Sequence, residues 1–473
     1  MSSTDMKTVR RGSRTFFLIW FGQLISLIGS NMTSFGLGVW VSQNTGSVTQ
    51  YAITILCNLV PTSLVAPIAG AIVDRFDRRK VMIISDSAAG LSSLFVATMF
   101  FTGRLEVYHI YLSSIVTAIA GTFQTPAYQA TITLLVPRDQ YKRAAGLLQL
   151  SEALGLLIAP PLAGLLLVTI ELQGIILLDF FTLFFSLFTL ATARFPSLPF
   201  NGENDRPTTS ILEEIAFGMR FILRYPGFIA MTLYVVLFLQ ILFGFATALI
   251  TPLVLSFADE FVFGLVIGAI GIGALVGGIL MAVWGGFKSR TNTILIFAIP
   301  YGLSLIAGGL RPDPLVGAIA GFTLGVAHSM VIGSNRVLWQ MKVPPEIQGR
   351  VFSTRLLIAV GAQSLGTLIA GPLADRIFEP LFAAPRVLPG LLNIPSILPL
   401  RPAGGLANTV GTVIGVGQGR GMAFMFVLLG ILALIATVFA ARSRNLRRLE
   451  YDMPDAIRIE KITPDELPPA TEF

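Results

Sequence analysis

Residues 70–80 read Gly70-Ala71-Ile72-Val73-Asp74-Arg75-Phe76-Asp77-Arg78-Arg79-Lys80 and join two long apolar segments, 51–73 and 81–102. Each segment is long enough to cross a bilayer core, which takes about 20 apolar residues in a helix. The same alternation of apolar segment and short charged connection continues along the chain in both directions. The stretch therefore predicts a helical membrane protein and not a soluble enzyme.

The composition and the segment count agree with this prediction. Hydrophobic residues make up 54% of the 473 residues and charged residues only 12%, whereas soluble domains carry roughly 25% charged residues. We expect an all-α membrane protein with twelve transmembrane helices in two six-helix, pseudo-symmetric bundles. The predicted spans are 15–41, 51–73, 81–102, 109–135, 144–168, 174–193, 227–256, 263–285, 291–310, 315–339, 351–375 and 421–441.

The basic residues predict the orientation of the chain in the membrane. Of the 33 Lys and Arg residues, 25 fall on the side that holds both termini, six fall on the other side, and Arg336 and Arg355 lie within spans. Basic loops stay in the cytoplasm, so both termini are expected there. The net charge of +7 is then explained by anchoring at anionic membrane lipids, and no nucleic-acid partner is expected.

The two halves are related in sequence. Residues 136–143 align without a gap on 343–350, and the same offset carries Ala163-Gly164 onto Ala370-Gly371. Parallel repeats of this kind are typical of transporters whose halves rock about a central site. The predicted parts are an N-terminus (1–14), a first bundle (15–193), a cytoplasmic linker (194–226), a second bundle (227–441) with a long external loop (377–419), and a tail (442–473).

The charged stretch after the second span has the residues of a gate. Gly70 lets another helix approach closely. Asp74 can meet the positive N-terminus of a neighbouring helix, expected to be the eleventh span. Arg75, Arg78 and Arg79 can pair with carboxylates and hold the cytoplasmic side closed. The stretch resembles the loop signature of the major facilitator superfamily, G-x-x-x-D-R-x-G-x-R-R in outline, with Asp77 in place of a glycine.

A second motif lies in the fifth span. Its small residues and proline would allow tight packing against the eighth span and bend the helix. The pattern is similar to the antiporter signature of the same superfamily, which implies export, although Ala159 and Ala163 replace two glycines. The motif positions are Gly146, Gly155, Pro160 and Gly164.

The resemblance extends over about residues 14–375 and 420–450. Gly22 to Gly29, Thr45-Gly46-Ser47 and Gln124-Thr125-Pro126-Ala127 look like the branch that holds macrolide-efflux proteins and enterobactin-type siderophore exporters. The resemblance implies a bacterial inner-membrane exporter without a cofactor that exchanges protons for an amphipathic small molecule and functions as a monomer. The arginine that other drug–proton antiporters carry in the fourth span is missing.

Ionisable residues within spans are candidates for proton coupling, because a charge in hydrocarbon is costly unless it has a cavity or a partner. Glu152 is the first choice, since it is expected to be the deepest carboxylate, with a structural pair to Arg336 or Arg355 as the alternative. Asp86 is expected to pair with the basic loop 78–80. Asp179 is expected near the outer end of the sixth span, as a second proton site, a gate or an interfacial residue.

The family's architecture implies that spans 1, 4, 7 and 10 line the substrate cavity. Amide, aromatic and imidazole side chains in these spans suit a large amphipathic molecule, although each is equally compatible with a hydrogen bond between helices. Arg336 and Arg355 are expected to be gate or ion-pair partners. The candidate substrate residues are Gln23, Asn31, Gln124, Gln129, Tyr234, Gln240, His328 and Asn335.

Other functional classes have less support. The sequence contains no H-E-x-x-H, G-x-S-x-G or G-x-x-x-x-G-K-[ST] pattern, so neither enzyme activity nor ATP hydrolysis is expected, and no metal site is predicted. A proton-coupled uptake symporter and a lipid flippase of the same fold remain alternatives to export.

Overall fold

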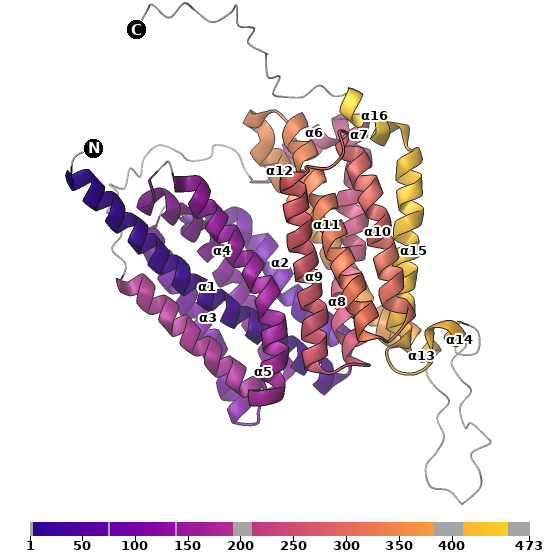
Figure 1. Cartoon of the computed structure of the whole chain (residues 1–473), viewed down its shortest axis with the longest axis horizontal. Coiled ribbons are helices and arrows are strands. Elements are labelled where there is room, and N and C mark those ends of the chain that lie inside the picture. Colours follow the sequence, from indigo (N-terminus) through magenta and orange to yellow (C-terminus); the bar gives the residue numbers. More distant parts are fainter. Residues whose placement is uncertain (1–2, 74–75, 138–139, 193–210, 383–409, 453–473) are drawn as a thin grey trace, which may run out of the picture.

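The computed structural model describes residues 3–73, 76–137, 140–192, 211–382 and 410–452. In this part of the chain every regular element is a helix (Figure 1). Lipid requires this, because a helix satisfies its own backbone hydrogen bonds. Large apolar side chains stand on the outside of the molecule, among them Ile84, Phe181 and Val283, each more than 60% exposed. The exterior is therefore suited to contact with lipid tails.

The N-terminal half is built from five helical elements. The last of them contains two helices, because Glu171 has φ 57° and ψ −178°, a conformation outside the helical region, and the chain reverses there. The sequence pattern predicted separate spans on either side of this residue. The elements are α1 (Ser3–Thr45), α2 (Val48–Val73), α3 (Arg78–Phe101), α4 (Val107–Leu135) and α5 (Tyr141–Thr192).

The C-terminal half follows a helix within the expected linker, α6 (Ile211–Arg224). Its first span is continuous but includes a π-helical segment, so three consecutive elements form it: α7 (Pro226–Met231), η2 (Thr232–Phe238) and α8 (Leu239–Leu255). The remaining elements are α9 (Glu260–Val283), α10 (Arg290–Leu310), α11 (Pro314–Lys342), η3 (Pro345–Ile347), α12 (Gln348–Leu373), η4 (Ala374–Phe378), α13 (Glu379–Leu381), α14 (Gly411–Ile414), α15 (Arg420–Arg442) and α16 (Arg444–Asp452).

These helices confirm the fold class that the sequence predicted. Ten segments of the described chain are long and apolar enough to cross a membrane. One of the ten is the segment Gly146–Thr192 of α5, which holds two predicted spans, and α4 is not among the ten although it fills the fourth span. Twelve spanning helices result when α5 is divided at Glu171 and α4 is included.

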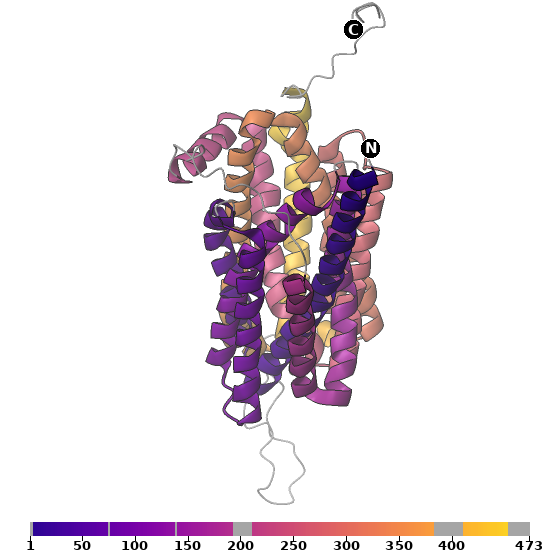
Figure 2. The ribbon, with the colours of Figure 1, turned by 90° about the vertical axis from the view of Figure 1, so that its left-hand side faces the viewer.

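The helices form two groups that lie at an angle to each other (Figure 1). The start of α1 and the end of α16 lie at the same end of the molecule, as the side view also shows (Figure 2). We call this the terminal end and the opposite one the distal end. The two groups approach each other toward the distal end in Figure 1.

The terminal end is ordered by short helices and caps. Asp77 accepts a hydrogen bond of 2.9 Å from the Arg79 backbone nitrogen and so caps α3, which accounts for an acid where the motif usually has glycine. Helix α6 lies against the start of α12, where the Thr354 hydroxyl donates to the Ile215 carbonyl over 3.3 Å. Part of the expected linker is therefore a helix packed on the second half.

Candidate functional site

A buried carboxylate, Asp86 on α3, is at the centre of the first bundle. Its side chain accepts hydrogen bonds from Gln23 over 2.9 Å, from Ser186 over 3.4 Å and from Gln124. Gln23 also donates to the Ser186 hydroxyl over 2.9 Å and accepts from Gln124 over 2.7 Å. Asp86 is only 2% exposed. Four polar side chains from α1, α3, α4 and the second part of α5 thus form one closed network, the Asp86 network.

A second carboxylate, Asp179 in the second part of α5, is 1% exposed. It accepts hydrogen bonds from the hydroxyls of Ser30 over 3.0 Å and Ser93 over 3.2 Å. Among the described residues, no Lys, Arg or His lies within ion-pair distance of Asp86 or Asp179. The described donors that hold both carboxylates in the bundle are therefore all neutral.

The two networks repeat with a seven-residue register on the same three helices. Gln23 and Ser30 are seven apart on α1, Asp86 and Ser93 on α3, and Asp179 and Ser186 on α5. Seven residues are close to two helical turns, so each pair lies on one helix face, about 10 Å apart along the axis. The register predicts two polar layers across the interior of the first bundle, and each layer contains one carboxylate.

The structure corrects three expectations about the carboxylates. Glu152 is exposed, whereas Asp86 and Asp179 are buried, and neither Arg336 nor Arg355 lies within ion-pair distance of Glu152. Asp86 does not pair with the loop 78–80, because α3 turns its side chain into the bundle, eight residues from Arg78. Asp179 is not interfacial, since its partners Ser30 and Ser93 lie well within α1 and α3.

Some of the candidate substrate residues are hydrogen-bonded inside a bundle, and the others are half-buried or exposed. Gln23 and Gln124 bind Asp86. Two candidates make hydrogen bonds inside the second bundle: the Tyr234 hydroxyl is 2.8 Å from that of Thr437 on α15, and Asn335 accepts from the Trp339 indole over 3.0 Å. The His328 ring is stacked on Phe243. Asn31, Gln240 and His328 are half-buried and Gln129 is exposed.

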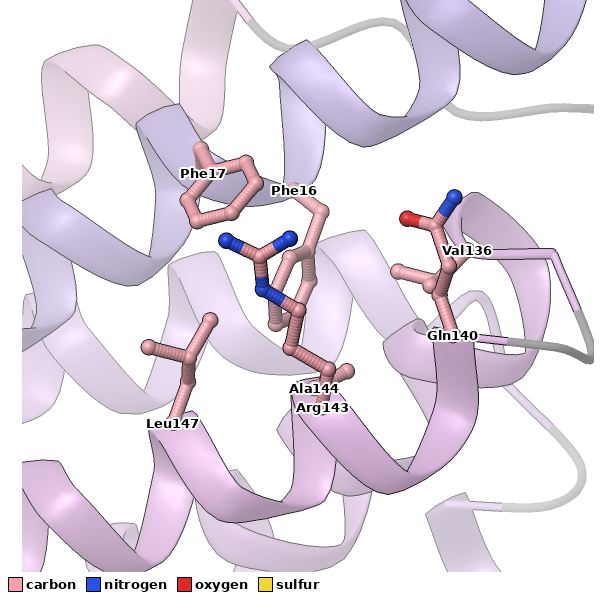
Figure 3. Close-up of a pocket in the computed structure, with 7 residues that line it drawn as sticks. All are labelled: Phe16, Phe17, Val136, Gln140, Arg143, Ala144 and Leu147. Atoms are coloured by element: carbon pink, nitrogen blue, oxygen red, sulfur yellow. The ribbon is translucent and has the colours of Figure 1, made fainter.

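A small hollow near the terminal end does not contain any of these candidates. Figure 3 shows the Arg143 guanidinium directed toward Phe16 and Phe17 of α1, with Leu147 beside it. The hollow is lined mainly by apolar side chains and is too small for a large amphipathic molecule. We therefore do not assign the substrate site to it.

The motif in the fifth span packs closely against α9, as expected. A Cβ atom at Gly164 would lie 2.5 Å from the carbonyl oxygen of Glu260, and one at Gly264 would lie 2.5 Å from that of Pro160. The other motif glycines differ. Gly155 lies against Asn31 and Leu27 of α1, and a Cβ atom at Gly146 would meet nothing within 4 Å. The tight contact between the bundles thus rests on reciprocal glycines, of which Gly264 lies outside the motif.

Replacing Gly264 with valine is expected to lower the thermal stability of the protein. The new side chain would press on backbone at Pro160, which cannot move aside, so a loss of about 1–3 kcal/mol is expected. Thermal unfolding of the purified protein measures the effect. Gly278→Val is the matched control, since it adds the same side chain to α9 where nothing lies within 4 Å. Equal melting temperatures for the two variants would contradict the packing argument.

Asp375 joins the two bundles at the distal end. It lies in η4, just after α12, and its carboxylate accepts four hydrogen bonds from the start of α2. The donors are the hydroxyl of Ser47 (2.7 Å), the backbone nitrogen of Val48 (3.0 Å), and the nitrogen (2.9 Å) and hydroxyl (2.7 Å) of Thr49. A carboxylate at a helix N-terminus satisfies free N–H groups and opposes the helix dipole. We call this contact the Asp375 latch.

The sequence contains a signal for the latch in addition to the motifs described above. Gly371-x-x-x-Asp375-Arg376 repeats the spacing Gly70-x-x-x-Asp74-Arg75. Gly371 is also tightly packed, because a Cβ atom there would lie 2.6 Å from the Thr49 Cα. Helices α2 and α12 therefore each end in the same pattern, at opposite ends of the molecule.

Further contacts between the bundles are found near the distal end. The Tyr51 hydroxyl is 2.7 Å from that of Thr251, and the rings of Phe35 and Phe263 are stacked with centroids 4.8 Å apart. Gln43 donates to the Glu260 carboxylate. The distal end is thus held together by the latch and by polar and aromatic contacts.

The gate motif at the terminal end is only partly described. Asp74 and Arg75 lie outside the described residues, and Gly70 lies in the last turn of α2. Arg79 donates hydrogen bonds to the carbonyls of Leu190, over 3.2 Å, and Ala191 in its own bundle. The buried Nε of Arg78 has no hydrogen-bond partner in the described chain.

Solved structures share the fold. A bacterial homologue of the human lysosomal transporter Spinster, solved in an inward-facing and unoccupied conformation, matches with a TM-score of 0.65 at 15% identity, over 94% of this chain and 98% of that one. A bacterial homologue of the iron transporter ferroportin matches with a TM-score of 0.61 at 13% identity, over 91% and 99% of the chains.

Sequence relatives are efflux proteins. Macrolide efflux protein A of Streptococcus pyogenes is 28% identical over 76% of this chain and 90% of its own. The multidrug efflux pump Tap of Mycobacterium tuberculosis is 25% identical over 86% of this chain and 100% of its own. The family model of the Major Facilitator Superfamily matches residues 19–367, and the chain belongs to this superfamily of membrane transporters.

Proposed function

We propose that the protein is a secondary active exporter that exchanges protons for an amphipathic small molecule, such as a drug, a macrolide-like compound or a siderophore. The observation that carries the proton coupling is the Asp86 network, an acid 2% exposed with only neutral partners among the described residues. The efflux relatives and the motif in the fifth span support export.

The proton site follows from the cost of an isolated charge in the membrane. An ionised carboxylate without a cation loses its hydration and recovers little from amides and hydroxyls. A bound proton removes the charge, and its release restores it. Asp86 is linked through Gln23 and Gln124 to α1 and α4, two of the helices that line the cavity in this family. Protonation of Asp86 can thus alter the contacts of these helices.

The alternation between two states uses the two matching patterns on α2 and α12. In the described state the Asp375 latch closes the distal end. When the bundles rock, the Asp375 latch opens and Asp74 binds the start of α12 in the equivalent way. Arg78 then binds a partner in the second bundle. Because both latches use the same helix pair at opposite ends, closing one favours opening the other.

The orientation and location complete the proposal. The terminal end faces the cytoplasm, because it carries most of the basic residues. The membrane is the inner membrane of a bacterium, as its bacterial relatives suggest. The protein works as a monomer in contact with membrane lipids.

Reconstitution in proteoliposomes tests the function. Purified protein is placed in vesicles with an imposed pH gradient and an internal pH dye, and a panel that includes a macrolide and a catecholate siderophore is added. We expect at least one compound to trigger proton movement opposite to its own. Movement of proton and compound in the same direction would identify a symporter instead. Compound or lipid movement without proton flux would overturn proton antiport.

A further inference from the structure

Among the residues that the structure describes, two arginines of the second bundle lack the ion pairs that were expected for them. Arg336 on α11 is exposed and Arg355 on α12 is half-buried. In the described part of the chain neither has an acidic group within 4.0 Å or a hydrogen bond. Two other arginines do have such contacts: Arg350 on α12 lies 4.0 Å from Glu214, and Arg79 of the first bundle donates to backbone carbonyls. No described acidic residue therefore serves these two cations as a local counter-charge.

The Arg355 guanidinium is held by a rigid aromatic support. It lies 5.4 Å from the ring centroid of Trp339. Trp339 is completely buried, stacked on Phe228 with centroids 4.3 Å apart, and hydrogen-bonded to Asn335. An arginine stacked on a ring keeps its N–H groups free at the edge, where they can grip a carboxylate with two parallel bonds.

Arg336 and Arg355 lie on neighbouring helices of the second bundle, α11 and α12. Helix α11 packs against α9 at Gly333, where Met281 lies close, and against α12 through Trp339 and Arg355. An exposed side chain at position 336 thus lies between α9 and α12. Helix α9 contacts α5 of the first bundle at Gly264, and the segment after α12 contacts α2 at Asp375. Along its helix, each arginine lies about 10 Å from the helix end that is at the terminal end of the molecule.

The two positive charges also act on each other, since Arg336 is within electrostatic range of Arg355. Like charges in a partly dry site repel, and a bound anion relieves the repulsion while it satisfies the free donors. We propose that Arg336 and Arg355 form a binding site for the anionic group of the amphipathic substrate, a carboxylate in the simplest case. This inference rests on the proposed function and narrows its substrate class.

Equilibrium binding to the purified full-length protein in nanodiscs of phosphatidylcholine tests the site. The probes are fusidate, an amphipathic steroid carboxylate, and its uncharged methyl ester, which share one apolar body. We expect Arg355→Gln to weaken fusidate binding roughly 30-fold and to change ester binding less than threefold. Arg336→Gln is expected to act in the same direction. Arg355→Lys is expected to be intermediate, because lysine keeps the charge and loses the paired donors.

Arg350→Gln is the matched control, since this arginine lies on the same helix and already has Glu214 near it; fusidate binding is expected to stay unchanged. Equal fusidate binding by wild type and both glutamine variants would overturn the site, and so would equal losses for acid and ester. An anionic lipid, phosphatidylglycerol, is then added to the nanodiscs to test whether the site binds the substrate's carboxylate or a lipid phosphate. If it competes with fusidate in wild type but not in Arg355→Gln, a lipid phosphate is the occupant and the substrate assignment is wrong.

The assay needs neither transport nor protons. Its failure is therefore distinguishable from a failure of proton antiport in proteoliposomes.

Discussion

Replacing Asp375 with alanine is expected to open the distal end of the protein. The substitution removes four hydrogen bonds to a carboxylate and the cap of α2. Because these bonds join two bundles, their loss should change the balance between the two states by about 3 kcal/mol, or roughly 100-fold. Fluorescence energy transfer between labels at Asn44→Cys and Val416→Cys, in a Cys57→Ala background, reports on the distal end. The distance in this pair is expected to increase.

A second pair of labels, at Phe76→Cys and Phe287→Cys, reports on the terminal end. The distance between these two labels should decrease as that end closes. Asp313→Ala is the matched control. Asp313 also caps a distal helix, α11, with bonds of 2.8 and 3.3 Å, but its partners lie in its own bundle. The Asp313→Ala substitution should reduce the stability of the protein without shifting the label distances between the bundles. If Asp375→Ala leaves both label distances as in wild type, or Asp313→Ala shifts them equally, Asp375 is only a local helix cap.

Replacing Asp86 with asparagine is expected to abolish substrate-triggered proton flux, down to the level of empty vesicles. Asparagine cannot bind and release a proton near neutral pH. It keeps the size of the side chain and an acceptor oxygen. The amide of Gln23 can turn to match the new donor, so the network and the fold are expected to survive. Flux in proteoliposomes gives the main result, and thermal unfolding confirms that the variant is folded.

Glu152→Gln is the control for this prediction, because it makes the equivalent change at an exposed carboxylate. Its proton flux is expected to remain close to wild type. Flux that persists in Asp86→Asn and disappears in Glu152→Gln would place coupling on α5, as the sequence first indicated. Flux that persists in both would direct attention to Asp179, the other buried carboxylate.

The sequence predicted the fold well because the bilayer imposes local rules. Apolar length defines a span, and the gate and antiporter patterns in the 70–80 and 146–164 segments indicate the superfamily. The same rules could not rank the carboxylates. Depth along a helix placed Glu152 ahead of Asp86, but burial depends on which face of the helix meets its neighbours. Only the packed bundle brings Gln23, Gln124 and Ser186 to Asp86.

The sequence by itself determined the helical membrane fold, the paired halves and the superfamily, since these follow from apolar length and from patterns within single segments. Tertiary structure decided which polar groups meet. It joined Asp375 to α2, more than 300 residues away in the chain, and within the described ranges it left Arg336 and Arg355 without the acids expected for them. The reason is physical: hydrogen bonds and ion pairs act over a few ångströms in space, whatever the separation of their residues in the chain.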